Sequence, residues 1–109
     1  MTNQELRQNN WEITEYVNEI KIFVARIELM SQEGTLQLIS VDEVDAAQKV
    51  AASLISSCRG QLRAKAKEFQ VLCASASDYY ANRENIDFYN LLWDIETVGT
   101  EIFDIHNTE

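Results

Sequence analysis

A basic cluster in the middle of the chain is the first candidate for chemistry. Four of the nine Lys and Arg residues fall between Arg59 and Lys67, in a chain whose net charge is −9. Arg59, Arg63 and Lys67 are spaced four residues apart and line one side of a helix, whereas Lys65 lies off this stripe. One hypothesis is that the stripe binds a small anion or phosphate at a subunit junction, or an acidic partner. The alternative, which the charge count favours, is that it neutralises acidic helices of its own molecule.

The overall charge argues against some partners. Eighteen acidic residues against nine basic ones give a field that repels phosphate. We therefore expect no direct binding to nucleic acid and no attachment to an anionic membrane surface. No apolar run approaches the roughly 18 residues needed to span a bilayer.

Residues typical of catalytic and metal sites are scarce. The single histidine, His106, lies three residues from the end, where we expect poor order. The sequence has no Glu-x-x-His motif and no glycine-rich phosphate loop. Glu12, Glu15 and Glu19 share a helix face, but such charge runs are usually solvated. We therefore expect no enzyme activity, no catalytic residue, no metal and no cofactor.

The two cysteines indicate a reducing environment. Cys58 and Cys73 are too few for a disulfide framework, lack metal-ligand spacing and occupy apolar positions of a helical pattern. The N-terminal residues are polar, unlike a signal peptide. These features predict a cytoplasmic protein, and a length of 109 residues predicts a single domain over 1–109.

The elements that position these residues are expected to be long helices. The chain has no proline and only three glycines, so few residues interrupt the helical pattern. A first helix is predicted from about Gln4 to Gln32, followed by Gly34 as a stop. Its apolar seam has spacings of three and four, with one polar member: Leu6, Asn10, Ile13, Val17, Ile20, Val24 and Ile27.

The second helix has a strong start. Ser40 and Glu43 form a capping box, so the helix is predicted to begin near Val41. It would continue to about Ala76, although its seam shifts near Gly60. Such a helix would be ~54 Å long, longer than the first. The mismatch indicates either a break near Gly60 or an overhang that packs on a second copy.

A connector is predicted over residues 75–85, followed by a third helix. The heptad seam of this helix has Gly99 beside it, where a small residue permits close helix approach. The seam members are Phe88, Leu91, Ile95, Val98, Ile102 and Ile105. The fold class is therefore all-α: an antiparallel bundle of three long helices, or four if the second breaks, with dimerisation as a further option.

More apolar residues are present than one seam per helix requires. Ile22 and Leu29 lie opposite the seam of the first helix, and Ile86, Tyr89 and Trp93 lie opposite that of the third. Tyr and Trp often anchor protein interfaces, so these five residues are the predicted partner-binding surface. The alternative is that the bundle packs them internally because the second helix folds back at Gly60.

The sequence thus favours a protein-binding module that acts through an aromatic and apolar helix face. An adaptor, a dedicated chaperone, or an inhibitor such as an immunity or anti-defence factor would all fit, as would a homo-oligomer. A second hypothesis is an acidic mimic that blocks a nucleic-acid-binding protein. Its face would be formed by the carboxylates of the last helix, which no Lys or Arg neutralises: Glu84, Asp87, Asp94, Glu96, Glu101 and Asp104.

Overall fold

The structure is a computed structural model that describes residues 3–82 and 88–108, with side chains described over 10–79 and 88–108. The predicted positions Ile86, Glu84 and Asp87 therefore lie outside the described residues. Over the described ranges the chain forms α-helices joined by short connections. The elements are α1 (Asn3–Glu33), the 3-10 turn η1 (Leu36–Leu38), α2 (Val41–Ser57), α3 (Gly60–Asn82) and α4 (Phe88–Thr108).

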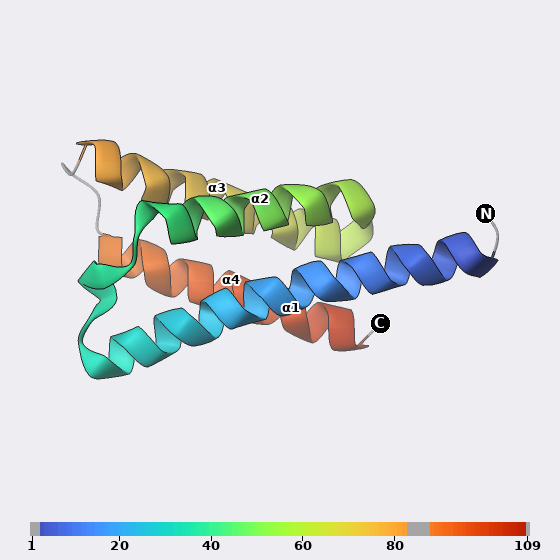
Figure 1. The fold of residues 1–109 in the computed structure, drawn as a ribbon, viewed down its shortest axis with the longest axis horizontal. Helices are drawn as coiled ribbons and strands as arrows, with labels where there is room; N and C mark the ends of the chain where they lie inside the picture. Colours follow the sequence, from blue (N-terminus) through green and yellow to red (C-terminus); the bar gives the residue numbers. More distant parts are fainter. Residues whose placement is uncertain (1–2, 83–87, 109) are drawn as a thin grey trace.

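The helices form an antiparallel bundle in which each runs opposite to the one before it (Figure 1). α1 packs between α2 and α4, and α3 packs between the same two helices on the other side. The bundle therefore has two layers, α1 with α4 and α2 with α3. The second predicted helix is broken, so the four-helix alternative is confirmed.

The N-terminal part of α1 extends beyond the other helices (Figure 1). At 1.5 Å per residue, its 31 residues span ~46 Å, whereas the 21 residues of α4 span ~32 Å. An overhang of the second predicted helix was the alternative to a break at Gly60. The helix that overhangs is instead α1. No helix over the described ranges has both the length and the apolar content that a bilayer span requires.

The end of α1 follows the glycine signal. Gly34 has φ of 73°, in the left-handed region that glycine adopts without a steric penalty. The Thr35 amide then donates to the Met30 carbonyl at 2.8 Å, and the Gly34 amide donates to the Ser31 carbonyl at 3.3 Å. This pair of bonds is a Schellman motif, which stops the helix and satisfies its last carbonyls.

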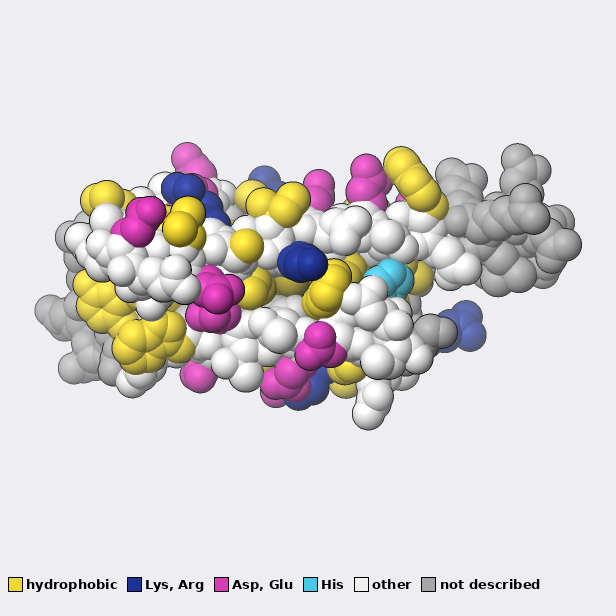
Figure 2. Space-filling model, turned by 90° about the horizontal axis from the view of Figure 1, so that it is seen from below, with side chains coloured by type: hydrophobic (Ala, Val, Ile, Leu, Met, Phe, Trp, Pro, Cys, Tyr) yellow, Lys and Arg dark blue, Asp and Glu magenta, His cyan; other side chains and the backbone are white. Residues whose placement is uncertain are grey.

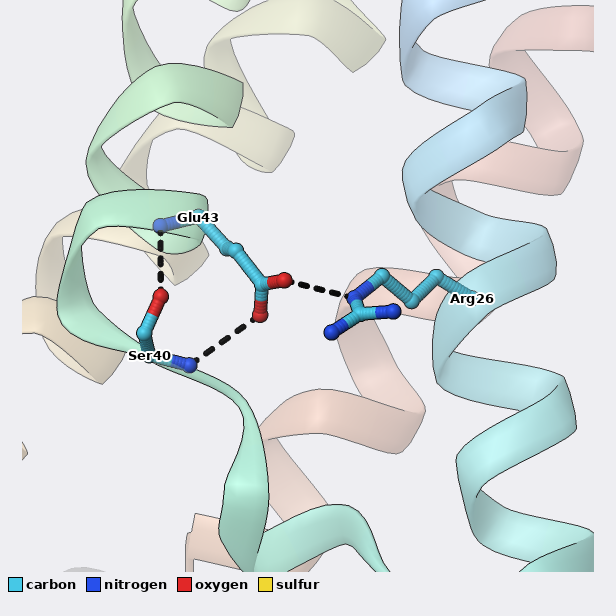
Figure 3. A network of polar contacts seen from close by, with 3 residues as sticks. All are labelled: Arg26, Ser40 and Glu43. Carbon is cyan, nitrogen blue, oxygen red and sulfur yellow. Dashed lines mark hydrogen bonds and ion pairs between the residues drawn. The ribbon is translucent and has the colours of Figure 1, made fainter.

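The predicted capping box starts α2 (Figure 3). The Glu43 amide donates to Ser40 Oγ at 3.2 Å, and the Ser40 amide donates to Glu43 Oε2 at 3.1 Å. The second carboxylate oxygen, Glu43 Oε1, lies 2.6 Å from Arg26 Nε on α1. One side chain therefore caps α2 and ties its first turn to the neighbouring helix.

The break between α2 and α3 occurs at Gly60. Cys58 is extended, with φ of −126° and ψ of 172°, and Gly60 has φ of 66°. These two departures from helical geometry, on either side of Arg59, reverse the chain, so that α3 packs back along α2. The shift in the apolar seam at Gly60 was thus the sequence signal of a tight turn.

α3 continues to Asn82, so the connector predicted from residue 75 was wrong over 75–82. Two contacts of this segment stabilise the added turns. Ser77 Oγ donates to Asp45 Oδ1 of α2 at 2.8 Å, and the Tyr79 ring stacks on Phe88 of α4 with 4.3 Å between centroids. Tertiary packing therefore overrides the weak helix propensity of the Ser and Asp residues here.

The core confirms most of the predicted seam positions. Ile13, Val17, Ile20, Val24 and Ile27 of α1 are buried. The second seam is buried from Val44 through Cys73, and Phe88, Ile95, Val98 and Ile102 are buried on α4. Three details differ: Asn10 is exposed, Ile105 is only partly buried, and Leu92 is fully buried whereas the predicted Leu91 is only partly buried. The side chain of Leu6, the first predicted seam member, lies outside the described residues.

Gly99 lies at a close contact between α1 and α4. A Cβ atom built there would overlap Val24 Cγ2, and it would lie 3.3 Å from Phe69 Cε2. The missing side chain therefore sets how near the two helices lie, as the sequence predicted.

Candidate protein-binding surface

Large apolar side chains remain exposed mainly on one layer of the bundle. Of the seven such residues among the described side chains, five lie on α1 or α4, namely Trp11, Ile22, Leu29, Tyr89 and Trp93. Figure 2 looks onto the α1–α4 side, where hydrophobic side chains gather at one end and alternate with acidic ones along the upper edge. We call the outward side of these two helices the α1–α4 face.

Four of the five predicted partner-binding residues are described, and all four are exposed. The exposed fractions are 69% for Ile22, 53% for Leu29, 44% for Tyr89 and 47% for Trp93. The chain does fold back at Gly60, yet the four-helix core does not cover these side chains. The alternative that the bundle packs them internally is therefore not realised within this chain.

Trp11 belongs to the same stripe of α1, although it is not one of the five residues predicted to bind a partner. Eighteen residues make five helical turns, so Trp11 and Leu29 lie on one side of α1, with Ile22 about 20° away. Trp11 is 65% exposed. The spacing alone could have identified this residue, had the stripe been extended toward the overhang.

The helices α1 and α4 form the walls of a small, half-open pocket. Its volume is about 150 Å³, and its lining is mostly apolar and includes the closely packed Gly99 and Val24. At one end Lys21 Nζ lies 3.9 Å from the centroid of the Phe103 ring, a cation–π contact. The complete lining is Lys21, Val24, Ala25, Glu28, Gly99, Thr100 and Phe103.

Glu28, which lines the pocket, and Glu96 of α4 are near enough across the two helices for their charges to interact. Burial raises the pKa of the Glu96 carboxyl above its ordinary value, and the negative charge of Glu28 raises it further. Neither carboxylate has an ion pair within the described part of the chain. The result is a pair of uncompensated acids beside an apolar pocket.

His106 fastens the end of α4 to α1 rather than fraying. Its Nε2 lies 3.1 Å from Thr14 Oγ1, and the Thr14 hydroxyl donates to the Asn10 carbonyl at 2.9 Å. α4 continues through Thr108, so the expected disorder at His106 was wrong. This histidine has a structural contact and no carboxylate partner in the described residues.

The basic stripe was expected to pair with acidic helices of its own molecule, and the described residues show no such pairs. Arg59, Arg63 and Lys67 are exposed, and none forms an ion pair with a described residue. Lys65, the residue off the stripe, lies 2.6 Å from Glu101 of α4 and 3.1 Å from Glu68. Hydrogen bonds to Glu101 and then to Glu68 raise the pKa of Lys65.

The carboxylates of the predicted mimic face are spread around α4. By helical rotation, Asp94 and Glu101 lie on one side, Glu96 lies on the opposite side near α1, and Asp104 lies between. Glu101 is also engaged by Lys65. The described part of this face is therefore not a single row of free charges.

Metal and thiol chemistry find little support in the described residues. No group of three His, Cys, Asp or Glu side chains there is arranged to hold a metal ion. Both cysteines are buried thiols outside any disulfide, and burial raises the pKa of the Cys73 thiol to about 12. Such a thiol stays protonated and is a poor nucleophile.

Comparison with known proteins finds no matching family model, no matching curated protein and no matching solved structure.

Proposed function

We propose that this chain is a non-enzymatic protein-binding module whose α1–α4 face is the contact surface. The observation that carries the proposal is the exposure of Ile22, Leu29, Tyr89 and Trp93 on two adjacent helices whose buried sides already complete the core. Exposed apolar residues that gather in a patch, rather than lying scattered singly, usually mark a surface for another protein.

The aromatic residues make this face a better candidate than the rest of the surface. Tyr and Trp supply large contact areas and are enriched among residues that dominate binding energy. The α2–α3 layer has only Val71 as a large exposed apolar side chain among its described residues. An adaptor, a chaperone or an inhibitor would each use such a face, and self-association into a homodimer could use it as well.

Capture of a partner tests the proposal. A tagged copy is incubated with lysate of the source organism at ~150 mM salt, where exposed charges are already partly screened. We expect a stoichiometric protein partner that is lost with Trp93→Ala and kept with Val71→Ala. Val71 is the matched control because it is apolar and 64% exposed but lies on α3.

Light scattering on the purified chain tests the homodimer. A dimer whose mass falls to that of a monomer in Trp93→Ala would assign the face to self-assembly. Capture that is unchanged in Trp93→Ala, Tyr89→Ala and Ile22→Ser would contradict the proposed surface.

A further inference from the structure

The negative charge of the molecule is concentrated on one layer. By sequence, α2 and α3 contain five acidic and four basic residues, with Arg59 between them, whereas α1 and α4 together contain ten acidic and only three basic residues. Of the basic side chains described on α1, Arg26 is engaged by Glu43 and Lys21 lies over Phe103. The α1–α4 layer thus presents an acidic surface, and a complementary partner would be basic.

The pocket between α1 and α4 indicates that the partner would also present an apolar group. Gly99 and Val24, whose backbone and side chain lie in close contact, both line this space. An apolar cavity of about 150 Å³ is large enough to bind benzene, and therefore one aliphatic or aromatic side chain. Exposed Ile22 and Leu29 on one side and Trp93 on the other extend the apolar surface beyond the pocket.

The two uncompensated acids fix where a positive charge would lie. Glu28 is four residues, or about one helical turn, from Val24 along α1, which corresponds to ~6 Å. Glu96 lies a similar distance from Gly99 along α4. A cation placed between these carboxylates would relieve their mutual repulsion at a site that is already partly desolvated.

We infer that the α1–α4 face binds a basic amphipathic helix of its partner, with an apolar side chain in the pocket over Gly99 and a Lys or Arg about one turn away between Glu28 and Glu96. This inference rests on the proposed function and adds the chemistry of the partner. A helix fits because residues three and four apart lie on one side of it, which is the spacing that the pocket and the acid pair require.

A synthetic peptide tests the inference directly. The probe is a fluorescein-labelled 14-residue peptide of Leu and Lys in amphipathic helical order, and fluorescence anisotropy measures its Kd at ~50 mM salt. Two control peptides replace every Lys by Glu or every Leu by Ser. We expect binding of the Leu/Lys peptide alone, because the face offers both an apolar pocket and acidic side chains.

Protein variants assign the binding to this site. Glu28→Gln with Glu96→Gln should weaken binding roughly fivefold to tenfold, as expected for two exposed charge contacts, and should reduce its salt dependence. Ala25→Phe should block the pocket at an exposed helix position. The control double variant Asp42→Asn with Asp78→Asn removes two charges from the α2–α3 layer and should leave the Kd unchanged.

Equal weakening by both double variants would overturn the inference, since it would mean unspecific attraction to an acidic protein. A lack of peptide binding would also overturn it. If the lysate partner is lost with Trp93→Ala but is unaffected by Glu28→Gln with Glu96→Gln and by Ala25→Phe, the proposed function stands and the inference fails. Displacement of the partner by duplex DNA, with full affinity in Ala25→Phe, would instead indicate nucleic-acid mimicry and would equally overturn it.

Discussion

Glu43 of α2 holds Arg26 of α1 with a 2.6 Å contact between Oε1 and Nε, while its other oxygen accepts the Ser40 amide of the capping box (Figure 3). The same carboxylate thus sets both where α2 begins and how it lies against α1. Glu43→Gln separates the two roles. Its side-chain oxygen still accepts the Ser40 amide, but it carries no charge to pair with Arg26.

Ser40→Ala removes the cap and should lower the free energy of unfolding by about 1 kcal/mol. Ser40→Thr is the matched control, since it keeps the hydroxyl. Glu43→Gln retains an acceptor for the Ser40 amide and loses only the partly exposed ion pair, so its cost should be roughly 0–1 kcal/mol. Urea unfolding followed by circular dichroism measures all three, and a larger loss for Glu43→Gln than for Ser40→Ala would contradict the assignment.

Gly99→Ala should destabilise the bundle, because the added Cβ overlaps Val24 Cγ2. Overpacking typically costs about 1–3 kcal/mol, and the better helix propensity of Ala offsets only about 1 kcal/mol of that. Combining Gly99→Ala with Val24→Ala should cost less than the sum of the two single losses, since the clash is removed. A double-mutant cycle with strictly additive effects would show that the two positions do not pack against each other.

Glu96→Gln should raise the free energy of unfolding at pH 7 by roughly a few tenths of a kcal/mol after solvent screening. The folded pKa of Glu96 is raised, so the stability that this group contributes is present below about pH 4 and is lost as the pH rises through the folded pKa. Gln does not titrate, so the variant and the native protein should converge at acidic pH. Asp78→Asn is the control, and a gain that grows toward low pH would contradict the sign.

The Cys73 thiol should resist alkylation in the folded protein, because burial raises its pKa to about 12 and leaves almost no thiolate at pH 8. Mass spectrometry after iodoacetamide treatment should find Cys73 unmodified in native protein and modified in guanidinium chloride. The Cys58→Ser variant isolates this site. Rapid modification of Cys73 under native conditions would mean that the core opens locally.

The helical fold was predictable from apolar spacing, because each long seam matched a buried stripe. Ser40 and Glu43 also identified the start of α2, because a capping box depends only on residues that are close together in the sequence. The end of α3 was not predictable, because the Tyr79–Phe88 stack and the Ser77–Asp45 hydrogen bond join residues from different helices. Local propensity cannot include such contacts.

The candidate surface was only partly predictable. Exposed Ile22, Leu29, Tyr89 and Trp93 followed from their positions opposite the seams. The pocket at Gly99 and the pairing of Glu28 with Glu96 depend on how α1 and α4 align, which the sequence does not specify. The same limit explains why Lys65, rather than the Arg59–Lys67 stripe, was found to bind Glu101.

The affinity of the captured partner for Trp93→Ala is the most direct test of the central claim. Trp93 is 47% exposed and does not belong to the buried core cluster, so the variant should fold with native circular dichroism. We predict a loss of about 2 kcal/mol or more in binding, a rise of roughly 30-fold in Kd, as for a hot-spot residue, with no change for Val71→Ala. An unchanged Kd in Trp93→Ala would contradict binding through the α1–α4 face.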